Sequence, residues 1–132
     1  RNGMKPLLCV GENAKERTEG KTARKISMQI NNAFKGLQAE QAKEVVVAYE
    51  PLWAIGSGQA ATAKDAQEVC HLIREKLTTM FGEKISRQVR ILYGGSVNEN
   101  NAVAFKISGI DGVLVGGASL NAKAFSAIVR SF

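Results

Sequence analysis

The sequence predicts an α/β protein built around a parallel sheet. Four short apolar segments alternate with longer segments that are apolar on one face only, which is the pattern of strands and helices alternating along a chain. One of these segments, Val45–Ala48, is a continuous apolar run, as expected for a parallel strand that is covered on both faces. The 132 residues are 45% hydrophobic and 23% charged, which fits one ordinary soluble domain and excludes a disordered chain.

The first strand is predicted at Leu7–Val10, where an apolar run ends before Gly11 and Glu12. The next segment predicts a helix, because its apolar residues recur at spacings of four, four and three residues and therefore share one face: Ile26, Ile30, Phe34 and Leu37. We expect this face to pack on the sheet.

The second strand leads to a carboxylate. Pro51 cannot donate a hydrogen bond to a strand ladder, so we expect the strand to stop at Glu50. Since α/β folds carry their chemistry at the carboxyl ends of the strands, Glu50 is a candidate catalytic residue. Taken alone, an acid before a proline also fits a plain strand end.

A glycine-containing loop follows Glu50. Its apolar residues Leu52, Trp53 and Ile55 precede or flank Gly56-Ser57-Gly58, a composition that suits a cover closing over a ligand. A simple turn explains the same glycines. Thr62 and Asp65 then have the spacing of a capping box, which predicts a helix from about Lys64 to Met80 with its apolar face at Val69, Leu72, Ile73, Leu77 and Met80.

The third and fourth units repeat the pattern. Strands are predicted at Val89–Tyr93 and Val113–Val115, with helices at about Asn100–Ile107 and Ala122–Arg130. A glycine pair follows each strand directly, at Gly94-Gly95 and Gly116-Gly117. Bare backbone amides at the ends of adjacent strands, before helix amino termini, form an anion site such as one for phosphate. Tight turns that require positive φ explain the glycine pairs equally well.

Composition narrows the function classes. The 18 basic and 12 acidic residues give a formal charge of +6, but the basic residues are scattered over helical faces without interleaved aromatics, which favours a solvated surface over nucleic-acid binding.

No apolar run approaches the roughly 18 residues of a membrane span, and the amino-terminal residues lack a signal-peptide pattern, so the expected location is the cytoplasm. Cys9 and Cys70 lack metal-site spacing, and we expect two buried thiols with no zinc site or disulfide.

Four motifs together resemble the triosephosphate isomerase family: LLCVGE, AYEPLWAIGSGQAAT, YGGSVNENN and GVLVGGASL. They stand in the order and spacing of that family and cover the chain from Pro6 to its end. The resemblance implies a (β/α)8 barrel of which residues 1–132 supply about four βα units, the carboxyl-terminal half. It also implies isomerisation between dihydroxyacetone phosphate and glyceraldehyde 3-phosphate in glycolysis and gluconeogenesis, through an enediolate.

The resemblance assigns roles to individual residues. Glu50 would be the general base, with Cys9 packed beside it and Leu114 as an apolar neighbour. The phosphate would accept hydrogen bonds from the amides of Gly56, Gly116 and Gly117, and from the amide and hydroxyl of Ser96. No cofactor or metal is implied, because proton transfer next to a carbonyl needs only a base, an electrophile and a grip on the phosphate.

The same resemblance makes the loop after Glu50 a lid. Its first hinge would be Pro51, Leu52 and Trp53, its tip Ala54, Ile55, Gly56, Ser57 and Gly58, and its second hinge Gln59, Ala60 and Ala61. The family usually has a lysine where Gln59 stands, a departure that bears on the movement of the lid and not on the chemistry. Tyr93 would hold the closed lid by a hydrogen bond.

The resemblance is to half of a barrel. The family's asparagine and lysine on the first strand, and its histidine after the fourth, have no counterpart here, and His71 is interpreted as a surface residue of a helix. We therefore expect a missing amino-terminal half barrel as partner, a homodimer when the protein is complete, and no activity from this chain alone. A self-assembling half barrel that binds phosphate without catalysis is the alternative, and a different phosphate-binding barrel enzyme is a third.

Overall fold

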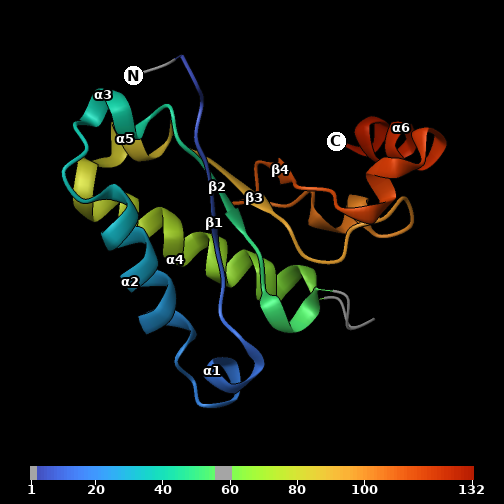
Figure 1. Ribbon diagram of the computed structural model, residues 1–132, viewed down its shortest axis with the longest axis horizontal. Helices are drawn as coiled ribbons and strands as arrows, with labels where there is room; N and C mark the ends of the chain where they lie inside the picture. The colour runs from blue at the N-terminus through green and yellow to red at the C-terminus, as the bar shows by residue number, and fades with distance from the viewer. Residues whose placement is uncertain (1–2, 56–60) are drawn as a thin grey trace.

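The structure, a computed structural model, describes residues 3–55 and 61–132. Four strands form a single sheet in the order β1-β2-β3-β4, and every pair of neighbours is parallel (Figure 1). The strands are β1 (Leu7–Val10), β2 (Val46–Tyr49), β3 (Arg90–Tyr93) and β4 (Gly112–Val113). Each strand thus pairs with the strand that precedes it in sequence, which confirms the predicted α/β class and parallel sheet.

Three helices of ten or more residues connect or follow the strands: α2 (Thr22–Phe34), α4 (Ala63–Phe81) and α6 (Ala122–Ser131). Shorter helical segments are α1 (Ala14–Thr18), α3 (Ala39–Ala42), α5 (Glu83–Ser86) and three 3-10 helices at Leu52–Ala54, Ala102–Phe105 and Gly117–Leu120. The capping box that the sequence predicts is present, since the Asp65 amide donates to Thr62 Oγ1 at 3.1 Å and the Thr62 amide donates to Asp65 Oδ2 at 3.2 Å.

The helix predicted at about Asn100–Ile107 is wrong, because only the 3-10 helix Ala102–Phe105 forms there. The Asn98 side chain accepts hydrogen bonds from the amides of Asn100 and Asn101, at 2.8 and 3.2 Å. Such local bonds from a side chain to the backbone compete with the start of an α-helix. The fourth strand is also shorter than the predicted Val113–Val115, and it begins one residue earlier.

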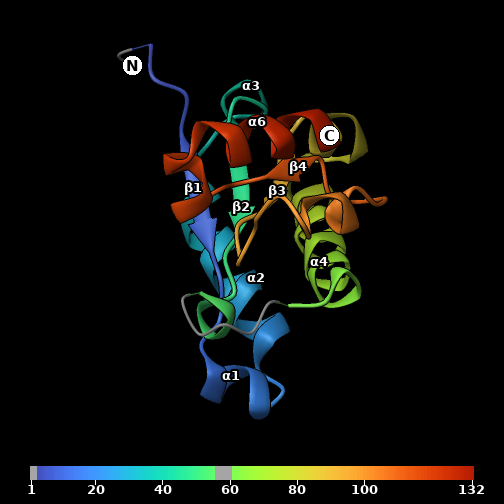
Figure 2. The ribbon, with the colours of Figure 1, turned by 90° about the vertical axis from the view of Figure 1, so that its right-hand side faces the viewer.

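Helices α2 and α4 cover one face of the sheet (Figures 1 and 2). The core between them holds apolar side chains that alternate along the strands and recur along the helices: Val47, Tyr49, Ile91, Tyr93, Ile26, Ile30, Phe34, Val69, Cys70, Ile73 and Leu77. All of these are at most 5% exposed. The expected helical faces therefore pack on the sheet.

The opposite face of the sheet is much less covered. Leu7, Cys9 and Arg90 are exposed there, and Val46 and Leu92 are only partly buried. The prediction that Val45–Ala48 is covered on both faces is nevertheless largely confirmed, since Val45, Val47 and Ala48 are buried and Val46 is partly buried. The exposed residues lie on β1 and β3, because α2 and α4 both lie on one side and α6 packs on the 3-10 helices beyond β4. For the same reason Cys9 is not the buried thiol that was expected, whereas Cys70 on α4 is buried.

The carboxyl ends of the strands are level with one another. Beyond the strands, backbone amides continue the ladder, with Glu50 donating to Val10 at 2.7 Å and Gly94 donating to Tyr49 at 2.8 Å. Leu114 donates to the carbonyl of Tyr93, also at 2.8 Å. These bonds place the residues that follow each strand side by side along one edge of the sheet.

Candidate active site

A cavity of about 530 Å3 opens at this edge. It is lined by residues that follow β2, β3 and β4: Glu50, Ile55, Gly94, Gly95, Ser96, Val97, Asn98, Leu114, Val115, Gly116 and Gly117. The structure thus brings the Glu50 carboxylate together with the glycine-containing loops after β3 and β4. The other described residues predicted for the site do not line this cavity: Cys9, Pro51, Leu52, Trp53, Ala54 and Tyr93.

Two glycines pack directly against Glu50, and sequence reasoning missed the purpose of both. A Cβ atom on Gly11 would lie 1.8 Å from the backbone oxygen of Glu50. A Cβ atom on Gly94 would lie 2.8 Å from Glu50 Cγ, 3.2 Å from its Oε1 and 3.4 Å from the Cβ of Leu114. Only glycine fits at either position without displacing the carboxylate residue. Leu114 is therefore separated from Glu50 by the bare backbone of Gly94.

Cys9 lies beside Glu50 across the β1–β2 pair. Partial burial, and then the charge and hydrogen bond of the Glu50 carboxylate, raise the pKa of the Cys9 thiol. The two side chains also line a small cleft together with Gly11 and Leu52. A thiol whose pKa is raised stays neutral near pH 7, so Cys9 adds no second negative charge next to the carboxylate.

The two glycine pairs differ in their surroundings. None of the four has a positive φ, so the explanation by left-handed turns is wrong. A Cβ atom on Gly95 would lie 2.0 Å from the Tyr93 hydroxyl, whereas a Cβ atom on Gly116 or Gly117 would meet nothing within 4 Å. The first pair is required by packing, and the second borders open space in the cavity.

Several residues that line this space have backbone amides without a described hydrogen-bond acceptor. No described residue accepts a hydrogen bond from the amide of Ser96 or Gly116, and Gly117 begins a 3-10 helix, so its amide has no partner within that helix. The first helical segments after β3 and β4 are 3-10 helices of four residues each. Anion binding at the two glycine pairs would therefore depend on the local backbone amides and not on the dipole of a long helix. The Ser96 hydroxyl, which the family resemblance assigns to the phosphate, donates here to the Ala54 carbonyl at 2.7 Å.

Residues 51–55 begin the predicted lid. Pro51 and Ala54 are buried, Leu52 and Ile55 are exposed, and Leu52–Ala54 forms a 3-10 helix. The predicted roles of Gly56, Ser57, Gly58, Gln59 and Ala60 lie outside the described residues. The Tyr93 hydroxyl, predicted to hold the lid, is buried and completes no hydrogen bond with a described group. Burial raises its pKa, and the nearby Ala61 backbone opposes part of that rise.

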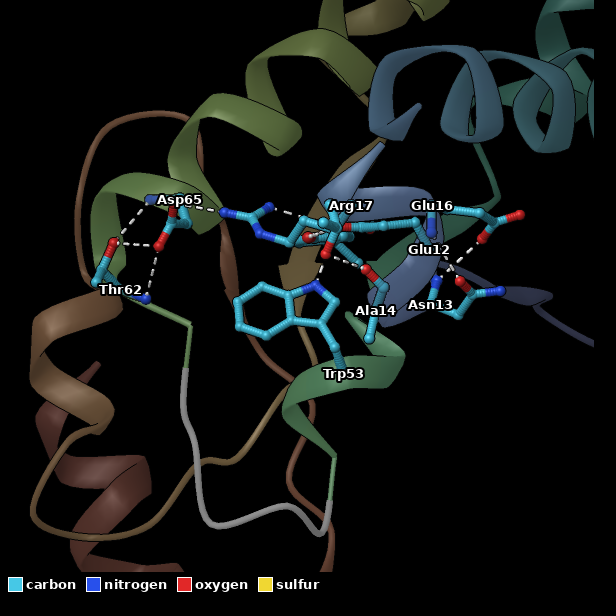
Figure 3. A network of polar contacts seen from close by, with 10 residues as sticks. Glu12, Asn13, Ala14, Glu16, Arg17, Trp53, Thr62 and Asp65 are labelled. Carbon is cyan, nitrogen blue, oxygen red and sulfur yellow. Dashed lines mark hydrogen bonds and ion pairs between the residues drawn. The ribbon is translucent and has the colours of Figure 1, made fainter. Parts of the chain in front are cut away.

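A buried carboxylate that the sequence did not single out lies beneath this segment. Glu12 is fully buried, and its Oε1 accepts a hydrogen bond from the Tyr49 hydroxyl at 3.0 Å. The same oxygen accepts from the Trp53 indole, also at 3.0 Å (Figure 3). Its backbone carbonyl accepts from the Leu52 amide at 3.1 Å. Burial, and then the Glu12 charge, raise the pKa of Tyr49. Glu12 lies two residues after β1, as Glu50 lies directly after β2, and a carboxylate just beyond a strand is the signal that could have identified it.

Other kinds of site find no support in the described part of the chain. No cluster of His, Cys, Asp and Glu within residues 3–55 and 61–132 could hold a metal ion. Over the same ranges, no helix is both long and apolar enough to cross a bilayer. His71 is exposed on α4 and does not line the cavity, as expected for a surface residue.

Comparisons with known proteins identify relatives. The family model described as "Triosephosphate isomerase" matches residues 1–132. Proteins named triosephosphate isomerase from Acetivibrio thermocellus and Carboxydothermus hydrogenoformans are 49% and 50% identical over 129 residues, which is 97% of this chain and 51% of each relative. The protein of the same name from Moorella thermoacetica is 52% identical over 131 residues, covering 98% of this chain and 52% of that relative. The chain thus spans about half the length of the curated relatives it matches.

Proposed function

Because the chain belongs to the triosephosphate isomerase family, we propose that it supplies the general base and the phosphate-binding site of an isomerase that interconverts dihydroxyacetone phosphate and glyceraldehyde 3-phosphate. The observation that carries this proposal is the single cavity shared by the Glu50 carboxylate and the amide-bearing loops of Ser96, Gly116 and Gly117. A triose phosphate has an anionic end for the amides and a carbon-bound proton for the carboxylate.

In the proposed reaction, Glu50 removes a proton from the carbon next to the carbonyl group and returns it to the neighbouring carbon. The amides of Ser96, Gly116 and Gly117 bind the phosphate, and Gly56 adds one more by the family resemblance. Gly11 and Gly94 leave the space that the backbone and the side chain of Glu50 occupy, since a Cβ at either position would collide with that residue. This supports a defined position of the base relative to the phosphate. Such fixed orientation and general base catalysis act together, and the latter commonly contributes about 10²–10⁴-fold.

The electrophile for the developing oxyanion is proposed to come from a complementary amino-terminal half barrel. In the described part of the sheet, β1 and β4 each pair with a strand on one side only, and unpaired strand edges favour pairing with further strands. The less covered face carries Leu7, Val46 and Leu92, which suit the interior of a closed barrel. The completed protein is proposed to be a cytoplasmic homodimer, as its family suggests.

The test compares the turnover of the unsubstituted protein with that of the Glu50→Gln variant, each in an assembly that contains both halves of the barrel. Glutamine keeps the size of the side chain but removes the basic lone pair, so turnover is expected to fall by about 10²–10⁴-fold or more while phosphate affinity stays within a few-fold. The isomerisation of glyceraldehyde 3-phosphate is followed, with the 132-residue chain alone expected to be inactive. Equal turnover of the two assemblies would remove Glu50 from the role of base.

A half barrel that assembles with itself and binds phosphate without catalysis is the second candidate. The same two strand edges favour it, because two copies together would provide eight strands. Sedimentation of the 132-residue chain distinguishes the cases: a discrete, cooperatively unfolding dimer that binds inorganic phosphate supports self-assembly. A chain that stays ill-ordered until the complementary half is added supports the isomerase.

A further inference from the structure

The guanidinium of Arg17 joins three segments that are distant in sequence. Its centre lies 4.5 Å from the centroid of the Trp53 ring, in the geometry of a cation–π contact. Nη2 pairs with Asp65 Oδ1 at 2.6 Å, and Nη1 lies 3.4 Å from Glu12 Oε1. In Figure 3 the guanidinium lies between α1, the indole of Trp53 and the start of α4. A planar cation with several donors can stack and pair at once, which a lysine cannot do.

The two carboxylate oxygens of Asp65 make different interactions. Oδ2 accepts from the amide and the hydroxyl of Thr62, at 3.2 and 2.6 Å, and so caps α4. Oδ1 pairs with Arg17. The first interaction belongs to the helix itself, whereas the second reaches a different βα unit. Asp65 therefore connects the start of α4 to Arg17 independently of its capping role.

Trp53 and Asp65 stand on either side of residues 56–60, and Trp53 follows Glu50 by three residues. We propose that Arg17 is a positioning residue, which holds the segment after the candidate base in a fixed position relative to the start of α4. It acts through Trp53 and Asp65 and does not reach the cavity. Its significance for turnover rests on the proposed isomerase, but the coupling itself is a property of the folded chain.

The coupling is tested by fluorescence, because Trp53 is the only tryptophan. In Arg17→Gln the indole loses its cationic cover, so a red-shifted emission and stronger acrylamide quenching are expected. Asp65→Asn presents an amide in place of the pairing oxygen while its remaining oxygen can still cap α4. The same shift, in the same direction, is expected from Asp65→Asn. The double variant should show no further shift, since both substitutions act through one guanidinium.

Two controls separate the coupling from general effects. Lys15→Gln removes a charge from the exposed side of α1 and should leave the emission unchanged. Thr62→Ala removes a capping hydroxyl but keeps the Arg17–Asp65 pair, and it should also leave the emission unchanged. An unchanged emission in Asp65→Asn, an additive shift in the double variant, or an equal shift in Thr62→Ala would each overturn the proposal. The spectra are recorded without substrate on the assembly of both halves, in which the complementary half adds the same background to every variant. The result therefore does not depend on activity, and a negative result leaves the proposed isomerase standing.

Discussion

Replacing Gly94 by alanine tests whether the position of Glu50 controls turnover. The added Cβ would lie 2.8 Å from Glu50 Cγ, whereas ordinary van der Waals contacts begin at 3.4 Å. The side chain of Glu50 must therefore move by about 0.6 Å, or rotate away from its rotamer at a cost of about 0.5–1.5 kcal/mol. Gly94 does not have a positive φ, so alanine adds no backbone strain.

A misplacement of about 1 Å in a catalytic group can lower turnover by about 10²-fold, so Gly94→Ala is expected to reduce kcat by roughly 10–100-fold. Phosphate binds through other residues in the proposal, and its affinity should stay within about twofold, which corresponds to less than about 0.5 kcal/mol. The assay is isomerisation of glyceraldehyde 3-phosphate by the assembly of both halves, together with a titration of inorganic phosphate.

Gly112→Ala is the matched control. Its Cβ would lie 3.2 Å from Cδ2 of Leu92, so it introduces the same added methyl group and a milder crowding in the sheet without touching Glu50. Its kcat should stay within a few-fold of the unsubstituted assembly. If Gly94→Ala retained full turnover while folding normally, the reasoning that connects the Glu50 position to the chemistry would be refuted.

Three further predictions follow from other contacts. Gly117→Val should abolish measurable phosphate binding in a titration without unfolding the chain. A Cβ at this position meets no protein atom within 4 Å and would only occupy cavity space. An unchanged phosphate affinity would contradict the proposed phosphate site. Asp111→Asn should lower the free energy of unfolding in urea by about 1–2 kcal/mol, since Asp111 pairs with Arg74 at 2.8 Å, and a loss no larger than that of an exposed control would contradict this. Hydrogen bonds from Thr62, and then the charge of Arg17, hold the pKa of Asp65 below its ordinary value of 3.8. The ionised Asp65 therefore adds to the free energy of unfolding above about pH 4, and this contribution should be lost as the pH falls through the lowered pKa. Asp65→Asn should remove that part of the acid dependence, measured as unfolding free energy against pH.

Much of the fold could be predicted because its determinants are local. The apolar run before Glu50 and Pro51 predicts a strand that ends at the carboxylate, and the Thr62–Asp65 spacing predicts where α4 begins. Both depend on backbone hydrogen bonds between near neighbours. Helices α1, α3 and α5 were missed because four or five residues are too few to show a helical period.

The candidate site was predicted in part, for a physical reason. Glu50, Ser96, Gly116 and Gly117 each follow a strand, and parallel strands bring their carboxyl ends together. The contact between Arg17 and Asp65 spans 48 positions and depends on the tertiary fold, which no local pattern encodes. The exposure of Cys9 could not be foreseen either, because strand composition does not reveal how many helices cover each face.

The order of the strands bears on how such a chain acquires its structure during synthesis. Every strand pairs with the one made just before it, so the sheet can extend from β1 toward β4 as the polypeptide emerges, without waiting for a distant segment. Each parallel pair still has to close a crossover connection between the two strands, and such pairing is slower than that of a local hairpin. The last strand joins through only two residue pairs, Leu92 with Gly112 and Tyr93 with Val113, so the side of the cavity that holds Gly116 and Gly117 is completed last. Maturation of the anion-binding loops therefore lags behind placement of the carboxylate.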